Sequence, residues 1–272
     1  MSCDPDSLRQ AAEELRSARD VVVFTGAGAS AESGIPTFRD VEGLWTRFPP
    51  EEFATWGGLL RSAVTHPDRL AEFLYVVFQP IAAAEPNAGH RAIADVEKHT
   101  RVTVVTQNID NLHQDAGSTV VREVHGSLFE IVTRKGKFVR RVSRAEMREM
   151  VASLDQARHG RFALPRVLLA MRRYLGIDVR GLHRPNVVLF GDAMAEPAWS
   201  QAMDACQTCD CLIQVGCSGV VMPAAMLPYE ATCRGASVIS IDPQECPGDL
   251  WLEGPAATVL PALVQAAFGP NG

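Results

Sequence analysis

The sequence predicts an α/β fold built on a parallel sheet with helices on both faces. Near-continuous apolar runs of strand length alternate with helical stretches, the pattern of a parallel sheet that is buried on both sides. The residues of chemical interest follow the ends of these runs, where open α/β sheets bind their ligands. We expect strands at 21–25, 102–106, 120–124, 187–190, 211–215 and 238–241.

The helices between these strands are expected at 5–18, 67–80, 87–98, 143–157, 162–175, 197–208, 223–234 and 258–268. The first carries Leu8, Ala11, Ala12 and Leu15 on one face, which is typical of an amphipathic helix. The segments 41–79 and 127–185 contain no strong parallel strand. We therefore expect a sheet domain over 1–40, 80–126 and 183–272, and a smaller, mainly helical lobe over 41–79 and 127–182.

The composition indicates a globular enzyme rather than a membrane or polyanion-binding protein. Hydrophobic residues make up 47% and charged residues 21% of the chain, and the net charge is −6. These fractions are ordinary for a folded domain. Apolar runs fall short of the roughly 20 residues that cross a bilayer, and the N-terminus lacks a signal-peptide pattern. Seven cysteines, an odd number, favour free thiols in a reducing compartment, so we expect a cytoplasmic protein.

The segment 127–185 differs from the remainder of the chain in charge. It carries 14 Lys or Arg and 5 Asp or Glu, a net charge of +9. One interpretation is a solvated helical face. The other is a docking surface for an acidic partner, with nucleic acid as one class.

Three closely spaced cysteines, Cys206, Cys209 and Cys211, have the spacing of metal ligands. They lie where a predicted helix runs into an apolar strand, and a tetrahedral site needs a fourth ligand. We interpret them as buried thiols that pack as small hydrophobic groups, and predict no metal site.

The motif Gly26-Ala27-Gly28-Ala29-Ser30-Ala31 follows the apolar strand 21–25 and matches the dinucleotide fingerprint G-x-G-x-x-G/A. The first glycine permits a tight turn, and the second lacks the Cβ that would block a pyrophosphate. A glycine-rich turn for purely structural reasons is the alternative. The flanking strand favours dinucleotide binding on a Rossmann-like sheet.

The second half of the redox fingerprint is missing. A redox dinucleotide fold continues into a second strand that ends in an acid about 20 residues later. Here Gly34-Ile35-Pro36-Thr37-Phe38-Arg39-Asp40 follows at once, and Gly and Pro indicate a loop. Phe38 offers a face for a flat ring and Arg39 a cation for phosphate, so the loop is expected to cover a ligand. Hydride transfer is disfavoured.

Three further clusters follow predicted strands. Gln107, Asn108 and Asp110 are polar side chains after 102–106, where an Asx-rich helix cap is the alternative. His125 precedes Gly126 and could act as a base or be a satisfied structural histidine. The turn from Gly216 to Pro223 offers backbone N–H groups, for an anion or a ribose, or for simple helix capping.

As a set, these motifs strongly resemble the sirtuin family over about residues 5–265. They are GAGASAESGIPTFRD, EPNAGHRAIA, TQNIDNLHQDAG, VHGS, PNVVLFGD and GCSGVVMPA. The resemblance implies a Rossmann-like domain and a smaller lobe, with NAD and acyl-lysine meeting in the cleft between them. It implies an NAD-dependent protein-lysine deacylase that releases nicotinamide and O-acyl-ADP-ribose.

The resemblance also implies residue roles. His125 would be the general base, and Asn108 would share the catalytic site. The acyl peptide would be held as an added strand by 187–191 and 219–221, with Val188, Leu189, Phe190, Gly191, Gly219, Val220 and Val221 as its contacts. NAD would be held by Gly26, Ala27, Gly28, Ser30, Ile35, Phe38, Arg39, Gln107, Asn108, Ile109, Asp110, His125, Gly216, Cys217, Ser218 and Asp242. The family usually carries Asn where Asp242 stands.

The chain departs from the family in its small lobe. Most sirtuins have two Cys-x-x-Cys pairs after the His-Gly-Ser motif, whereas this chain has no cysteine between His125 and Pro185. His159 and His183 alone do not make a zinc site. We predict a zinc-free lobe held by two packed helices, with a small core of Leu154, Phe162, Leu164, Val167, Leu168, Met171, Tyr174 and Leu175.

The acyl specificity follows from a second comparison with the family. Members that prefer succinyl or malonyl lysine carry a Tyr and an Arg at positions that align near Leu74 and Val77. An acidic acyl group would be buried there without a cation, at a cost of several kcal/mol. We expect acetyl or longer aliphatic acyl groups.

Two other function classes remain open at the level of sequence. One is a mono-ADP-ribosyltransferase or NAD glycohydrolase, and the other is a non-catalytic NAD-binding interaction module. The presence of His125 and of the substrate segments favours the deacylase over the first. The complete set of polar residues favours an enzyme over the second.

Overall fold

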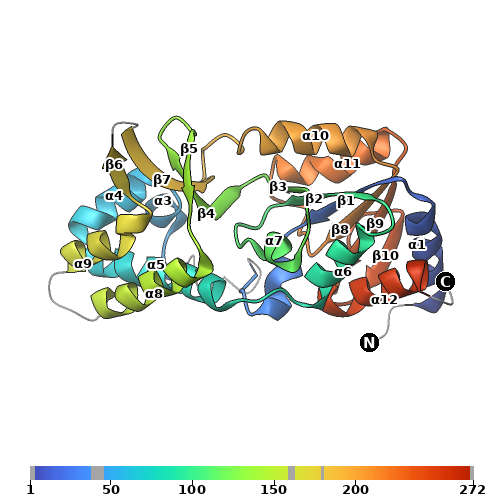
Figure 1. Cartoon of the computed structure of the whole chain (residues 1–272), viewed down its shortest axis with the longest axis horizontal. Helices are drawn as coiled ribbons and strands as arrows, with labels where there is room; N and C mark the ends of the chain where they lie inside the picture. Colours follow the sequence, from blue (N-terminus) through green and yellow to red (C-terminus); the bar gives the residue numbers. More distant parts are fainter. Residues whose placement is uncertain (1–3, 38–45, 159–162, 179–180, 270–272) are drawn as a thin grey trace. The chain divides into compact units, whose positions relative to one another are not determined.

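The computed structural model describes residues 4–37, 46–158, 163–178 and 181–269 (Figure 1). The chain divides into two compact units. The larger comprises Met1–Thr37, Glu85–Val124 and Ala195–Gly272, and the smaller comprises Phe38–Ala84 and His125–Met194.

The larger unit is built on a six-stranded sheet with the order β10-β9-β8-β1-β2-β3, in which every neighbouring pair is parallel. This confirms the predicted α/β fold, and five strands lie where the apolar runs predict them. Strand β10 was not predicted. The strands are β1 (Asp20–Thr25), β2 (Arg101–Thr106), β3 (Val121–Glu123), β8 (Cys211–Val215), β9 (Ser237–Asp242) and β10 (Leu250–Glu253).

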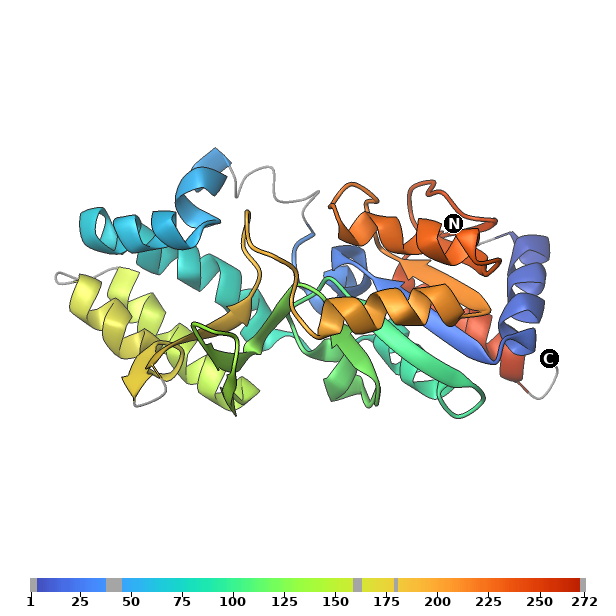
Figure 2. The same ribbon diagram turned by 90° about the horizontal axis from the view of Figure 1, so that it is seen from above.

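Helices cover both faces of this sheet (Figure 2). One face is covered by α1 (Pro5–Ser17), α6 (Ala88–Val96) and α12 (Ala256–Phe268), and the other by α10 (Ala198–Thr208) and α11 (Leu227–Cys233). The alternate side chains of the strands form the core with the first group of helices. Its fully buried members include Ala11, Leu15, Val23, Val104, Val215, Ile239 and Leu263.

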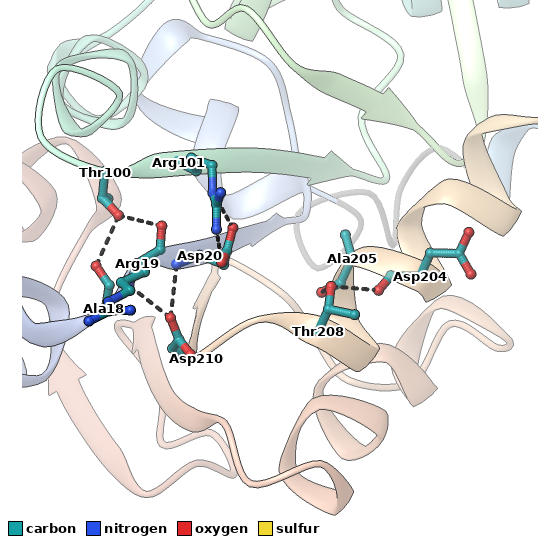
Figure 3. Close-up of polar contacts among 9 residues, drawn as sticks. All are labelled: Ala18, Arg19, Asp20, Thr100, Arg101, Asp204, Ala205, Thr208 and Asp210. Atoms are coloured by element: carbon teal, nitrogen blue, oxygen red, sulfur yellow. Dashed lines mark hydrogen bonds and ion pairs between the residues drawn. The ribbon is translucent and has the colours of Figure 1, made fainter.

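Polar contacts fix the amino-terminal ends of β1 and β2 (Figure 3). The carboxylate of Asp210 accepts hydrogen bonds from the backbone N–H groups of Arg19 (2.8 Å) and Asp20 (3.0 Å). Arg101 pairs with Asp20 across the two strands, and the Thr100 hydroxyl donates to the Ala18 carbonyl at 2.9 Å. The opposite, carboxyl-terminal edge of the sheet is where the chemically interesting residues lie.

The smaller unit combines helices with a four-stranded antiparallel sheet of order β5-β4-β7-β6, which was not predicted. Strand β4 is buried at most positions and therefore shows no alternating pattern in the sequence. The strands are β4 (Gly126–Thr133), β5 (Phe138–Arg141), β6 (Gly176–Asp178) and β7 (Gly181–Val187). The helices are α3 (Pro50–Phe53), α4 (Trp56–Thr65), α5 (Pro67–Ala83), α8 (Arg144–Arg158) and α9 (Ala163–Ala170).

The expected strand at 187–190 is wrong. Strand β7 ends at Val187 and runs antiparallel to β4, and the following residues form a loop. The apolar run that suggested a buried strand ends in Phe190, which is 62% exposed.

The predicted small core of this unit is partly correct. Leu154, Val167, Met171 and Tyr174 are buried, and the Tyr174 ring packs edge-on against Phe78 with centroids 5.4 Å apart. Two predicted members are exposed instead, namely Leu168 (53%) and Leu175 (37%). Phe162 lies outside the described residues. The core is completed from α5 and from the sheet.

Candidate functional site

The glycine turn after β1 packs backbone against backbone on the turn after β8. The Gly28 N–H donates to the Gly216 carbonyl at 3.0 Å, and the Gly26 N–H donates to the Val215 carbonyl at the same distance. A Cβ on Gly28 would lie 2.6 Å from Gly216 Cα, and one on Gly26 would lie 2.7 Å from the Gly216 oxygen. These two glycines are therefore required by the fold itself, a reason that differs from the predicted approach of a phosphate.

A short 3-10 helix, η1 (Ala27–Ser33), continues from this turn. It places Ser30, which is buried, at the carboxyl end of the sheet. The Ser30 hydroxyl donates to Asp110 Oδ2 at 2.7 Å and accepts from Asn108 Nδ2 at 3.0 Å. Asn108 Nδ2 also donates to the Gly26 carbonyl at 3.0 Å.

Asp110 is anchored on its other side. The residue is buried, and its Oδ1 accepts from the Leu112 N–H at 3.0 Å, at the start of α7 (Leu112–Ala116). The alternative of an Asx turn is thus present, but the same carboxylate also reaches Ser30. The structure therefore brings Gly26, Ser30, Asn108 and Asp110 together in one hydrogen-bonded cluster, which we call the turn network.

Gln107 and Cys217 lie next to the turn network. Gln107 Nε2 is 3.6 Å from Cys217 Sγ, and the Gln107 N–H donates to the Thr25 carbonyl at 3.0 Å. Burial strongly raises the pKa of the Cys217 thiol. Cys217 is therefore a neutral packing group beside Gly26 rather than a nucleophile.

The far side of the site is formed by the ends of β8 and β9. Asp242 is buried, and its Oδ1 accepts from the Gln244 N–H at 2.9 Å. Ser218 and Gly219 are exposed, and Val220 is 75% exposed. Ile35 is half-exposed, and its N–H donates to the Ser30 carbonyl at 3.3 Å.

Three residues that support the turn were given no role from the sequence, although Asn87 and Thr106 lie within the motifs quoted above. Thr25 and Thr106 end β1 and β2 and are joined through their hydroxyl groups at 2.8 Å. Asn87 caps α6, and its Nδ2 donates to the Ala29 carbonyl at 2.9 Å. A threonine directly after a run of apolar residues, at the last position of each strand, was the available signal for Thr25 and Thr106.

His125 belongs to the smaller unit, directly before β4, and is partly exposed. Its carbonyl accepts from the Val188 N–H at 3.0 Å. Gly126 has φ 76°, and a Cβ there would lie 1.9 Å from the Asn186 oxygen. Glycine is therefore required after His125 for steric reasons.

The segment 188–191 forms a loop anchored within the smaller unit. The Phe190 N–H donates to the Ala54 carbonyl at 3.0 Å, and the Leu189 N–H donates to Asp192 Oδ2 at 3.1 Å. Gly191 has φ 89°. Leu74 and Val77 lie half-buried on α5. The predicted residues Phe38 and Arg39 lie outside the described residues.

The cysteines at the end of α10 and the start of β8 are buried, as interpreted. Burial raises the pKa of Cys206 and Cys211 to about 12 and that of Cys209 to about 11. Among the residues that the structure describes, no group of three or more His, Cys, Asp or Glu is placed to hold a metal ion. Within the same residues, no helix is long and apolar enough to cross a membrane.

The fold and the turn network define an α/β dinucleotide-binding protein, and comparison with known proteins gives its family. The Sir2 family model matches residues 26–223. An NAD-dependent protein deacylase of Desulfosudis oleivorans is 38% identical over 272 residues, covering 96% of this chain and 95% of the relative. The chain belongs to the Sir2 family.

Solved structures agree with this assignment. A Sir2 homologue in complex with NAD is 30% identical, with a TM-score of 0.75, and the match covers 98% of this chain and 95% of the homologue. A second, bound to a myristoylated histone peptide, is 31% identical with a TM-score of 0.69, covering 97% of each chain.

Proposed function

We propose that this Sir2-family NAD-dependent protein deacylase removes acetyl or longer aliphatic acyl groups from lysine, releasing nicotinamide and O-acyl-ADP-ribose. The observation that carries the proposal is the turn network, in which Ser30, Asn108 and Asp110 are fixed beside the glycine turn. A purely structural turn does not require a buried carboxylate and a buried hydroxyl joined to a partly buried amide in one cluster.

The residues at this edge of the sheet fit NAD. Gly26, Ala27, Gly28 and Ser30, which form the turn after β1 and the start of η1, would hold the pyrophosphate, with Gly26 and Gly28 fixed by their own N–H bonds to the Val215 and Gly216 carbonyls. Gln107, Asn108, Ile109 and Asp110 would hold the nicotinamide ribose and carboxamide. The adenosine half would contact Gly216, Cys217, Ser218 and Asp242. Ile35, Phe38 and Arg39 would belong to the loop that covers the nicotinamide.

NAD supplies a glycosidic bond that is cleaved when nicotinamide leaves. His125 is the proposed general base, and it must be neutral near pH 7 to accept a proton from a ribose hydroxyl on one of its ring nitrogens. Asn108 would orient the ribose. The amide of Asn108, bonded to both Gly26 and Ser30, supports an orienting role because its side chain has little freedom.

The acyl peptide would lie along residues 188–191 and 219–221. Val188, Leu189, Phe190, Gly191, Gly219, Val220 and Val221 would contact it, and the exposure of Phe190 and Val220 supports this role. Leu74 and Val77 would contact the acyl chain. Their apolar character favours acetyl or longer aliphatic groups, and a homologue that binds a myristoylated peptide supports the longer ones.

We also propose that the larger unit holds NAD and that the smaller unit is a zinc-free lobe. The absence of cysteine between His125 and Pro185 in the sequence supports the second statement. Metal analysis of purified protein tests it, and one tightly bound zinc per chain would refute it. A separate hypothesis for the same lobe is that its +9 segment binds an acidic partner.

The function is tested by incubation with NAD and lysine peptides carrying acetyl, butyryl, octanoyl, myristoyl and succinyl groups. Nicotinamide release that depends on an aliphatic acyl peptide supports the proposal, and a preference for succinyl refutes the acyl assignment. Release without peptide indicates a glycohydrolase, and ADP-ribosylated protein indicates a transferase. NAD binding without turnover indicates an interaction module.

A further inference from the structure

Two histidines lie completely buried behind the turn network. His90 on α6 and His113 on α7 are each 1% exposed, and their ring centroids are 4.8 Å apart. Each ring has one nitrogen without a hydrogen-bond partner among the described residues, namely His90 Nε2 and His113 Nδ1. Unpaired buried polar atoms are rare and each one needs an explanation.

The partners of His90 determine its tautomer. Its Nδ1 lies 3.4 Å from the backbone nitrogen of Asn87, a group that can only donate. Nδ1 must therefore be an acceptor, and a neutral His90 carries its proton on Nε2. The unpaired nitrogen of His90 is a donor.

The partners of His113 indicate that its unpaired nitrogen is an acceptor, whereas that of His90 is a donor. Its Nε2 lies 2.9 Å from Thr25 Oγ1, and the Thr25 hydroxyl donates to Thr106 Oγ1 at 2.8 Å. With its hydroxyl proton engaged in that bond, Thr25 accepts from His113 Nε2–H. The remaining His113 nitrogen, Nδ1, is then an acceptor, which complements the Nε2–H donor of the neighbouring ring.

Each histidine supports one side of the glycine turn. His113 bonds Thr25, which bonds Thr106, and Thr106 Oγ1 accepts from the Asn108 N–H at 3.0 Å. His90 forms a capping box with Asn87, whose Nδ2 holds the Ala29 carbonyl at 2.9 Å. Two chains of hydrogen bonds thus begin at adjacent rings and end at Asn108 and at η1.

We propose that His90 and His113 are a tautomer-matched pair of positioning residues for NAD binding, with one buried water that accepts from His90 Nε2–H and donates to His113 Nδ1. The pair joins the two chains of hydrogen bonds into one rigid support for the turn network. This inference rests on the proposed binding of NAD at the glycine turn. It adds two residues that neither touch NAD nor act on the reacting atoms.

Burial supports the neutral state that the pairing requires. Desolvation, with a smaller contribution from Arg91, lowers the pKa of His90 to about 4. Desolvation, followed by the proximity of His90, lowers the pKa of His113 well below its ordinary value. Neither ring carries a charge near pH 7, so one proton per ring is available for hydrogen bonding.

Nitrogen NMR of the ¹⁵N-labelled full chain tests the pairing without any assay of activity. Long-range ¹⁵N–¹H spectra at pH 7 should show both rings protonated on Nε2. A His113 ring protonated on Nδ1 would place two donors face to face and would overturn the proposal.

Variants of His113 test the functional part through the dissociation constant of NAD. His113→Leu removes the Thr25 bond and should raise that constant between about fivefold and about a hundredfold, the range for an unpaired buried polar group. His113→Gln retains an amide donor at the position of Nε2 and should return it to within about threefold of the parent. The matched control is His99→Gln, because the exposed His99 ring stacks on Phe268 away from the turn. This control should leave the dissociation constant of NAD unchanged.

The outcomes separate this inference from the proposed function. If the parent protein does not bind NAD, the proposed function fails. If the parent binds NAD and a folded His113→Leu protein binds it equally well, the positioning role is refuted. If His113→Leu does not fold, His113→Gln and the NMR result decide. A folded His113→Gln protein whose NAD dissociation constant rises well beyond threefold while that of His99→Gln stays at the parent value would contradict the proposal, as would a His113 ring protonated on Nδ1.

Discussion

The packing of the glycine turn on the β8 turn makes a direct prediction for Gly28→Ala. The added methyl group would lie 2.6, 3.0 and 3.2 Å from three backbone atoms of Gly216, and backbone atoms cannot move aside as a flexible side chain does. Overpacking of this kind costs about 1–3 kcal/mol. In a chain of this size that corresponds to a fall in melting temperature of roughly 2–10 °C.

The same substitution should weaken NAD binding, because the turn must shift away from β8 to admit the methyl group. The assay is differential scanning calorimetry together with NAD titration of the same preparation. Gly57→Ala is the matched control, because a Cβ on Gly57 meets nothing within 4 Å and the residue lies inside helix α4. It should be neutral or stabilise by up to about 1 kcal/mol. A Gly28→Ala protein with unchanged melting temperature and NAD affinity would refute the argument from packing.

Three further outcomes are expected. Ser30→Ala removes the donor to Asp110, and it should cost about 1–3 kcal/mol in urea unfolding and weaken NAD binding. The control is Ser33→Ala, because the Ser33 hydroxyl lacks a partner among the described residues. This control should change the unfolding free energy by less than about 0.5 kcal/mol. Equal effects of the two substitutions would contradict the role of Ser30. Burial lowers the pKa of His90 from 6.5 to about 4. Between these two values only the unfolded chain binds the proton on this ring. Within that pH range His90 should therefore lower the unfolding free energy by about 1.4 kcal/mol for each unit that the pH falls. His90→Asn should remove this share of the slope, and an unchanged slope would exclude His90 as its source. His125→Ala should abolish deacylation while circular dichroism and melting temperature stay near those of the parent, and full retained activity would remove His125 from the mechanism.

The larger unit was largely predictable because the burial of its strands is recorded in short stretches of consecutive residues. Strands such as Val21-Val22-Val23 are buried on both faces and therefore appear as uninterrupted apolar runs. The turn network was predictable as a group of polar residues at strand ends. That Ser30 bonds Asp110 was not, because the two residues are 80 positions apart in the chain.

The smaller unit was less predictable, since its strands show neither the alternation of apolar and polar residues of a half-buried strand nor a long uninterrupted apolar run. Strand β4 is buried at nearly every position, β5 is short and basic, and β7 contains Pro185. The exposed side chain of Leu168 fits a helical pattern that suggested burial, which shows that apolar periodicity alone cannot identify which faces acquire a neighbour. The steric reason for Gly28 lay in a turn far along the chain, at Gly216.

The measurement that bears most directly on the account is a crystal structure of the full chain with a slowly reacting NAD analogue and an acetyl-lysine peptide. We expect the pyrophosphate on the backbone of residues 26–30, with the nicotinamide ribose beside Asn108 and Asp110. A dinucleotide bound elsewhere, or density for the peptide with the glycine turn left empty, would contradict it.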